Sequence, residues 1–347
     1  MAVALVARGL GSAPTPEPPP PAPAPARPTP TLDLGPVDEG WTLLAADEEV
    51  WRVDARTEGG RLDVRVDGRP VESARLPVDV PVPSGGWRHV HVELFGPDGD
   101  LVAREEVGVL RLPAHLAREG PRAARAADGS LLLLVPPPAA RSYARPDLRV
   151  GNNNEYFDKL SRLSLDLARG PKPLAHPYLL GRCEVSAGQF RARFPDHEAA
   201  RGAPPDHPVA WVTREDADDY ARAFGLALPT LVEWMWAARG GDERPWPWGH
   251  AAPADLPANF GAAALPVDSL PEGAGRWGHL HLAGNVHEWV AVEADEGDGL
   301  LARCLAMGGS WTQGRRRPTS ATDLRLDVRP GSRHDAVGFR LVWRPDP

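Results

Sequence analysis

Three histidines lie close together in the C-terminal part of the chain, and histidine is the commonest metal ligand among side chains. They are His279, His281 and His287, and Glu288 follows directly. In a strand, His279 and His281 would share a face because alternate residues point the same way. With His287 or Glu288 they would then form a facial metal triad of the kind that holds iron. The alternative is that these histidines are exposed to solvent or satisfied by ordinary hydrogen bonds.

The chain has only two cysteines, Cys183 and Cys304. They lie too far apart in sequence for a C-x-x-C pair, so we expect neither a disulfide framework nor a cysteine zinc site. Both lie in strand-like sequence, where a cysteine is usually a buried and unreactive thiol.

A run of arginines near the C-terminus is the strongest candidate for a binding surface: Arg315, Arg316 and Arg317. Forked guanidinium groups suit carboxylates or phosphates. The alternative is a solvated loop that offsets the net charge of −8, which comes from 39 Lys plus Arg against 47 Asp plus Glu. Nucleic acids and anionic membranes attract basic proteins, so we expect neither as a direct partner. An acidic segment of a protein partner fits this loop best.

The elements that position these residues fall into about two domains, which is what 347 residues allow. A hydrophobic content of 42% with 12 Trp is enough for a core. No run approaches the roughly 18–20 apolar residues of a membrane span. The N-terminus also lacks the charged start of a secretory signal, so we expect a cytoplasmic protein.

Residues 1–36 are predicted to be a disordered, proline-rich arm. Ten prolines lie between Pro14 and Pro30, and such a segment favours polyproline II and acts as a spacer. A ligand for a proline-binding groove is the alternative.

Residues 37–115 are predicted to form a small β-sandwich of the immunoglobulin type. Residues 61–67 and 89–94 alternate apolar and polar side chains, and Asp-Gly pairs mark the turns between such segments. His89 and His91 point the same way, as a metal pair would, but a solvated polar face explains them as well.

A helical or irregular connector is expected at residues 116–127, followed by an α+β domain at residues 128–347. Ser186, Thr213 and Thr230 each stand three residues before Gln, Asp or Glu, which predicts three helices with capping boxes. The last 100 residues are rich in Gly, Pro and Trp and contain only short strand-like segments.

A series of short motifs in this second domain carries a family resemblance: Glu184-Val-Ser186, Pro208–Val212, Leu228-Pro-Thr230, Trp246–Gly249, Ala283–Val286 with Glu288-Trp289, Gly308–Trp311 and Gly338–Arg340. Their order and spacing resemble the formylglycine-generating enzyme (sulfatase-modifying factor) family over residues 128–345. The resemblance implies a variant of the C-type lectin fold. The residues themselves add that Glu288, between apolar neighbours, needs a partner if buried, and that Arg340 is a plausible one.

The resemblance also implies an activity that this chain lacks the residues to perform. Enzymes of the family oxidise a peptidyl cysteine with a copper(I) site made of two cysteines. Here those two positions hold Gln313 and Pro318, and neither side chain offers the soft sulfur that copper(I) requires. Since Cys183 and Cys304 lie outside this loop, we expect no catalytic residues and no copper.

Calcium is a second feature that the resemblance implies only in part. Asn259 matches the start of one calcium site of the family. Gly284, Val286 and Glu288 match another, but His281 stands where that site needs an oxygen ligand, and calcium prefers oxygen. We therefore expect no cofactor, or at most one calcium ion around Glu288.

Two functional hypotheses follow. The first is a catalytically inactive scaffold of this family that acts as a protein-binding module within a larger assembly. The second is a metal-dependent oxygenase that uses His279, His281 and His287. It resembles the iron-dependent sulfoxide synthases of the same superfamily, whose iron ligands come largely from an N-terminal helical bundle. The N-terminal half of this chain is instead β-rich in pattern.

Overall fold

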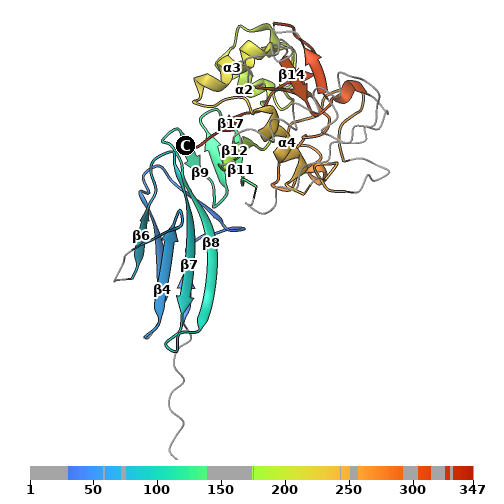
Figure 1. The fold of residues 1–347 in the computed structure, drawn as a ribbon. Helices are drawn as coiled ribbons and strands as arrows, with labels where there is room; N and C mark the ends of the chain where they lie inside the picture. The colour runs from blue at the N-terminus through green and yellow to red at the C-terminus, as the bar shows by residue number, and fades with distance from the viewer. Residues whose placement is uncertain are drawn as a thin grey trace, which may run out of the picture.

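The computed structural model describes residues 30–57, 59–71, 76–138, 174, 176–242, 244–250, 257–291, 304–313, 325–328 and 331–346. Figure 1 shows two parts, an all-strand N-terminal part and a C-terminal part in which short sheets, helices and loops are mixed. None of the helices in the described residues has the length and apolar character needed to cross a membrane.

The N-terminal part contains two sheets with orders β1-β3-β6 and β2-β8-β7-β4-β5. Valines from both sheets, including Val53 and Val80 from one and Val92 and Val109 from the other, form one buried cluster, so the sheets pack face to face. The alternation correctly predicted the strands at residues 61–66 and 87–95, because each directs alternate side chains into this core, among them Val64 and Val92. The strands are β1 Thr31–Asp33, β2 Trp41–Leu44, β3 Val50–Arg56, β4 Arg61–Val66, β5 Arg69–Pro70, β6 Val78–Pro81, β7 Trp87–Phe95 and β8 Leu101–Arg111.

Two expectations about this region are wrong at the level of single segments. Thr31–Asp33, expected in the disordered arm, form β1 and pair with β3, and Leu32 packs against the valine cluster. The rest of the arm, residues 1–29, lies outside the described residues. Residues 116–127, expected as a helical or irregular connector, contain two strands, β9 (Leu116–Arg118) and β10 (Ala123–Ala126). Ala124 and Ala126 are buried on one face of β10, a period-two pattern that small residues made hard to recognise.

A third sheet has the order β17-β12-β11-β10-β9. It joins β9 and β10 to β11 (Leu131–Val135), β12 (Tyr178–Gly181) and the C-terminal β17 (Val342–Trp343). A fourth sheet, β15-β14-β13-β16, is built from β13 (His287–Val290), β14 (Cys304–Met307), β15 (Arg325–Val328) and β16 (Val337–Gly338).

The predicted capping boxes are confirmed at Ser186, Thr213 and Thr230. Each cap accepts a hydrogen bond from the third helical N–H, which satisfies a donor that the helix itself leaves unpaired. The helices that follow are α2 (Ala187–Arg193), α3 (Arg214–Ala223) and α4 (Leu231–Arg239); short 3-10 turns are η1 (Glu198–Ala200), η2 (Pro271–Gly273) and η3 (Trp311–Gln313).

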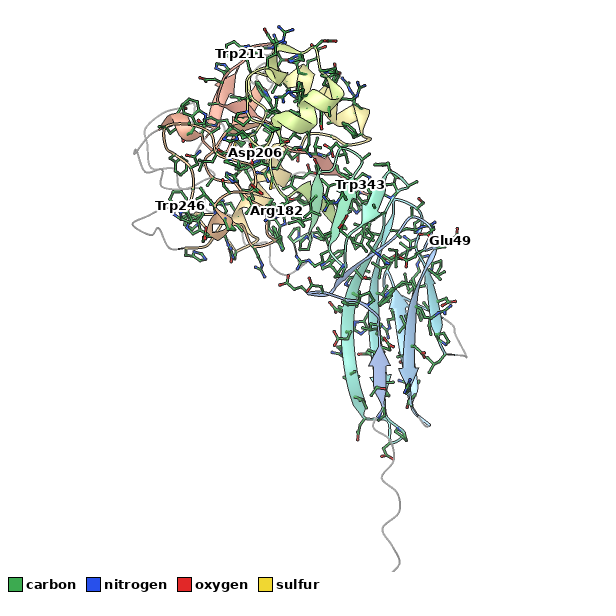
Figure 2. All side chains as sticks on the ribbon, turned by 180° about the vertical axis from the view of Figure 1, so that it is seen from behind. Glu49, Arg182, Asp206, Trp211, Trp246 and Trp343 are labelled. Carbon is green, nitrogen blue, oxygen red and sulfur yellow. The ribbon has the colours of Figure 1, made fainter. Side chains whose placement is uncertain are left out.

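The two parts of the molecule pack directly on each other. Leu110 and Leu112 at the end of β8 belong to the same buried cluster as Phe339 of the C-terminal part. The Trp87 indole donates a hydrogen bond to Nδ1 of His176, at 3.0 Å. Trp343, which Figure 2 shows where the two parts meet, also lies in this cluster.

Candidate functional site

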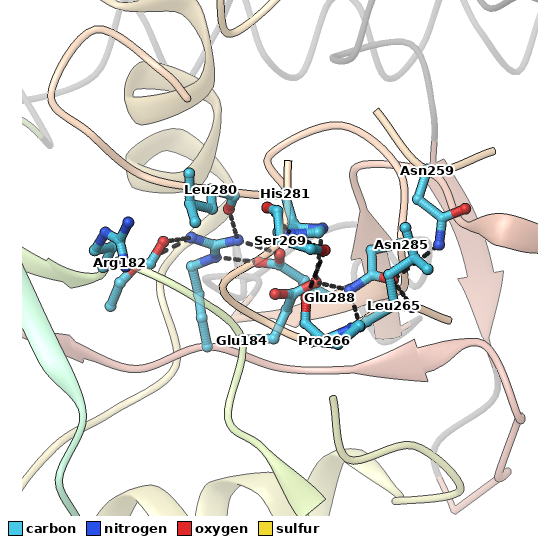
Figure 3. A network of polar contacts seen from close by, with 12 residues as sticks. Arg182, Glu184, Asn259, Leu265, Pro266, Ser269, Leu280, His281, Asn285 and Glu288 are labelled. Carbon is cyan, nitrogen blue, oxygen red and sulfur yellow. Dashed lines mark hydrogen bonds and ion pairs between the residues drawn. The ribbon is translucent and has the colours of Figure 1, made fainter. Parts of the chain in front are cut away.

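A buried ion pair in the C-terminal part belongs to a network of polar contacts around Glu288, which Figure 3 shows from close by. Glu288 on β13 and Arg340, which follows β16, are both fully buried. The guanidinium binds both carboxylate oxygens at 2.5 Å. The sequence-based pairing of Glu288 with Arg340 is therefore confirmed, and the bidentate geometry is the strongest form of such a contact.

The remaining hydrogen-bonding capacity of this pair is also used. The Trp234 indole donates to Oε2 of Glu288 at 2.8 Å. Arg340 donates to the carbonyl oxygens of Gly181 at 2.9 Å and Leu280 at 2.8 Å. The pair thus connects β12, α4, β13 and the loop before β13, segments up to 159 residues apart in sequence.

A second buried carboxylate, Glu184, lies beside this pair, and in the described part of the chain it has no ion-pair partner of its own at hydrogen-bonding distance. Its Oε1 accepts a hydrogen bond from Nδ2 of Asn285 at 3.0 Å. Its Oε2 has no partner among the described residues. Burial raises the pKa of Glu184 to about 7, although the positive charge of Arg340 acts in the opposite direction.

His281 faces Glu184 from an irregular segment. Its backbone has φ = 55°, in the left-handed region. Nε2 donates to the carbonyl oxygen of Ser269 at 2.9 Å, and Nδ1 lies 3.9 Å from Oε1 of Glu184. Burial lowers the pKa of His281 to about 4, so the ring is neutral at pH 7.

Asn285 connects this site to the preceding loop. Its Oδ1 accepts hydrogen bonds from Nδ2 of Asn259 at 3.0 Å and from the backbone N–H of Leu265 at 2.9 Å. Gly284, with φ = 85°, lies so close to Asn259 that a Cβ there would approach the carbonyl oxygen of Asn259 to 2.5 Å. The glycine is required because two backbone segments touch at this point.

The structure does not bring His279, His281 and His287 together as a metal centre. His279 and His281 lie outside any strand, and the left-handed backbone of His281 breaks the alternation that the prediction assumed. Burial lowers the pKa of His279 to about 3 and that of His287 to about 4. Within the described part of the chain, no group of three or more His, Cys, Asp and Glu side chains is arranged to hold a metal ion. These histidines therefore do not fit an iron site.

The Glu288 carboxylate does not fit the calcium site expected around it, because Arg340 and Trp234 already donate hydrogen bonds to its oxygens. The Asn259 side chain is likewise used within the protein: Nδ2 donates to the Ala263 carbonyl, and Oδ1 accepts from the N–H of Gly261. Val286 is fully buried in the core. These residues fit structural hydrogen bonding and do not fit the calcium ligand set that the resemblance implies.

Gln313, at the first copper-cysteine position, ends the η3 turn. Its Oε1 accepts a hydrogen bond from the backbone N–H of Ser310 at 3.4 Å. The side chain thus closes a turn, and its amide offers no soft ligand. Pro318 and the arginines Arg315, Arg316 and Arg317 lie outside the described residues.

Sequence reasoning missed two buried acids. Glu184 follows Cys183 and precedes Val185 in an apolar stretch, the same signal that drew attention to Glu288. Glu233 was predicted only as a helix cap, but it also accepts two hydrogen bonds from Arg344, at 2.6 and 2.5 Å. No local pattern indicated that pair, because the two residues lie 111 positions apart.

Comparison with known proteins gives a family match for much of this region. A family profile described as a sulfatase-modifying factor enzyme 1-like domain matches residues 154–345. Hercynine oxygenase of Mycolicibacterium thermoresistibile is 34% identical over 202 residues, 48% of this chain and 43% of that protein. Formylglycine-generating enzyme of Mycobacterium tuberculosis is 38% identical over 101 residues, 25% of this chain and 34% of that protein.

A relative named as inactive is also similar. The inactive C-alpha-formylglycine-generating enzyme 2 of Bos taurus is 30% identical over 154 residues, which are 40% of this chain and 50% of that protein. The chain spans half or less of the length of each of these three relatives.

Proposed function

Because the chain belongs to the sulfatase-modifying factor family through its domain at residues 154–345, we propose that it is a catalytically inactive member that binds a protein partner. The observation that carries the proposal is Gln313, which stands at the first copper-cysteine position and closes the η3 turn through its hydrogen bond to Ser310. Pro318 stands at the second position. Neither residue can supply a thiolate, so this site cannot bind copper(I) as the resembled enzymes do.

The module would act within a larger cytoplasmic assembly. In this proposal residues 128–347 form a C-type-lectin-like domain, residues 37–115 an immunoglobulin-type sandwich, and the proline-rich arm a spacer. Direct packing between the two parts supports a single rigid unit. The proposed binding surface is formed by Arg315–Arg317, and the proposed partner is an acidic protein segment, since guanidinium groups pair well with carboxylates.

A second candidate, an iron-dependent oxygenase, is favoured by the similarity to the hercynine oxygenases, which extends over 48% of the chain. That similarity weighs against the expectation of a protein without a cofactor. The histidines that were its candidate ligands, however, lie apart and buried. An active form would need ligands other than His279, His281 and His287 as placed here.

Measurements of metal content and of oxygen uptake distinguish the two candidate functions. The full chain is purified without chelators, its iron and copper are measured, and oxygen uptake is followed with hercynine plus a thiol, and separately with a cysteine peptide. The inactive scaffold predicts substoichiometric metal and no uptake above buffer. One iron per chain with hercynine-dependent uptake would establish the oxygenase instead.

The binding proposal is tested by capture from host extract at low salt, with the three arginines changed to serine in the control bait. We expect one acidic protein to be retained by the wild-type chain and lost from the variant, and the purified pair to bind with strong salt dependence. Equal retention by both baits would contradict the assignment of the binding face to this loop.

A further inference from the structure

A cavity of about 290 Å³ lies at the junction of the two parts of the molecule. Asp38 lines it from the loop before β2, and Glu119 and Arg122 line it from the β9–β10 hairpin. Leu133 of β11 and Trp277 of the loop after η2 complete the wall. Ligand sites are frequent at such junctions, because two surfaces with different chemistry meet there.

The charged residues of the cavity are held by ion pairs, and those of Arg122 cross the junction. Arg122 forms an ion pair with Glu39, and its Nη1 lies 3.7 Å from Oδ2 of Asp38. Arg125 binds Glu119 at 2.7 Å. The charged residues that line the cavity are two carboxylates, Asp38 and Glu119, and one guanidinium group, Arg122, which leaves an excess of negative charge.

The carboxylates at the cavity are accessible to a ligand. Asp38 keeps 55% of its side chain exposed and Glu119 keeps 38%. Neither is enclosed as Glu288 is, so each can accept a further hydrogen bond without loss of its arginine contact. The cavity therefore presents carboxylate oxygens at its rim.

The apolar wall supplies the second element of recognition. Trp277 packs against Trp236, with ring centroids 6.2 Å apart, which fixes the position of the indole. Leu133 lies in the same wall. An aromatic ring attracts a cation through its π face, and an aliphatic side chain packs against methylene groups. Carboxylates beside such a wall are suited to an organic cation with an apolar chain.

We infer that this cavity binds a guanidinium or primary ammonium group carried on a short aliphatic chain, either a free small amine or an arginine or lysine side chain of another protein. The cation lies against Trp277 and pairs with Asp38 and Glu119, while the chain contacts Leu133. Because Asp38 belongs to the N-terminal part and Trp277 to the C-terminal part, the ligand also stabilises the docking of the two.

Titration calorimetry with agmatine, a guanidinium on a four-carbon chain with a terminal amine, tests the site on the full chain. We expect a Kd of about 0.1–1 mM, the range for a ligand of roughly ten heavy atoms, which weakens as salt is added. Asp38→Asn and Trp277→Leu are expected to weaken binding about fivefold to tenfold each. Trp277→Phe keeps an aromatic ring and is expected to retain most of the affinity. Asp98→Asn, an exposed acid in the β7–β8 turn, is the charge-matched control.

Two further probes complete the experiment. A capped Gly-Arg-Gly peptide that binds as well as agmatine identifies a protein side chain as the ligand, and a peptide that does not bind identifies a free amine. The inference is overturned if 1-pentanol binds as tightly as agmatine, or if Asp38→Asn behaves as Asp98→Asn does. Preferential binding of glutarate also overturns it, since that would make Arg122 the recognition group.

Discussion

The two parts of the molecule place their charged residues in opposite ways. In the N-terminal part, valines fill the core and ion pairs such as Arg52–Asp79 lie on the surface, with 63% and 47% of their side chains exposed. In the C-terminal part, Glu288 and Arg340 pair with both side chains fully buried. The strand region is therefore stabilised mainly by apolar burial, which tolerates charge changes. The mixed region depends on specific polar partners that lie far apart in sequence.

The largest effect is expected from Arg340→Met. The substitution leaves the Glu288 carboxylate buried without its counter-charge, and removal of one member of a buried pair destabilises by about 3–5 kcal/mol. Urea unfolding followed by circular dichroism measures the free energy of unfolding. Asp79→Asn, which breaks the exposed pair, is expected to leave the unfolding midpoint nearly unchanged because surface pairs contribute little.

A double variant, Glu288→Leu with Arg340→Met, sharpens this comparison. It removes both charges together, so we expect it to be more stable than Arg340→Met alone. If the double variant is as unstable as the single one, the cost comes from lost packing around Arg340 and the charge argument fails.

Leu94→Ala is expected to lower the stability of the N-terminal part, because this part depends on the burial of apolar side chains. Leu94 on β7 is fully buried, and a Leu→Ala change in a core destabilises by about 3 kcal/mol through lost transfer energy and the remaining cavity. Leu101→Ala, at a leucine that is 47% exposed, is the control and is expected to change stability by no more than about 0.5 kcal/mol. Equal loss from both variants would contradict an apolar core as the main source of stability in this part.

The pH dependence of stability depends on the polar core of the C-terminal part. Burial raises the pKa of Glu184 to about 7 from its ordinary value of 4.5. Its stabilising contribution is therefore complete below pH 4.5 and is lost as the pH rises through 7. The three buried histidines act in the other direction, since burial lowers their pKa values to about 3 or 4. Their contribution is present above pH 6.5 and is lost as the pH falls through about 4.

Glu184→Gln isolates the acid from the histidines, because glutamine cannot ionise and keeps the carbonyl oxygen that accepts from Asn285. Relative to wild type, its free energy of unfolding is expected to rise by about 2–3 kcal/mol between pH 4.5 and pH 8. Urea titrations at several pH values measure the difference. Glu105→Gln, at an exposed acid of β8, is the control variant. A stability difference for Glu184→Gln that does not change with pH would contradict the raised pKa.

The same contrast explains how much of the structure could be predicted from the sequence. Period-two alternation predicted β4 and β7 because burial of alternate side chains is a local property. The capping residues predicted α2, α3 and α4 for a similar reason. β8 was expected only from the Asp-Gly turn before it, and it buries four consecutive residues, 107–110. The period-two pattern was not recognised at residues 116–127. The buried positions of the strand there are occupied by alanines, whereas larger apolar residues would have made the alternation clear.

The candidate site was predictable only where one residue carried its own signal. Glu288 and Arg340 could be paired in advance because each charge stands between apolar neighbours. The histidine triad failed because it required His279 and His281 to lie in a regular strand, and the left-handed backbone at His281 turns the chain there. The Glu233–Arg344 pair had no local signal, since it depends on where α4 and the C-terminus meet in space.

The smallest predicted effect concerns Trp211, which Figure 2 shows at the end of the C-terminal part that lies opposite the N-terminal part. Trp211 is 47% exposed, and its backbone has φ = 61°, where a side chain with a Cβ is strained by about 1–2 kcal/mol. Trp211→Ala and Trp211→Gly lose the same indole contacts, so the difference between them reports the backbone alone. We expect the glycine variant to be the more stable by about 1 kcal/mol in thermal and urea unfolding. At Arg222, an exposed position in α3, the order is expected to reverse because alanine favours the helix. Alanine as the more stable residue at both positions would show that the loop relaxes out of the left-handed region once the indole is gone. In that case side-chain contacts would determine the backbone conformation of the irregular loops in the C-terminal part, as they determine the packing of its core.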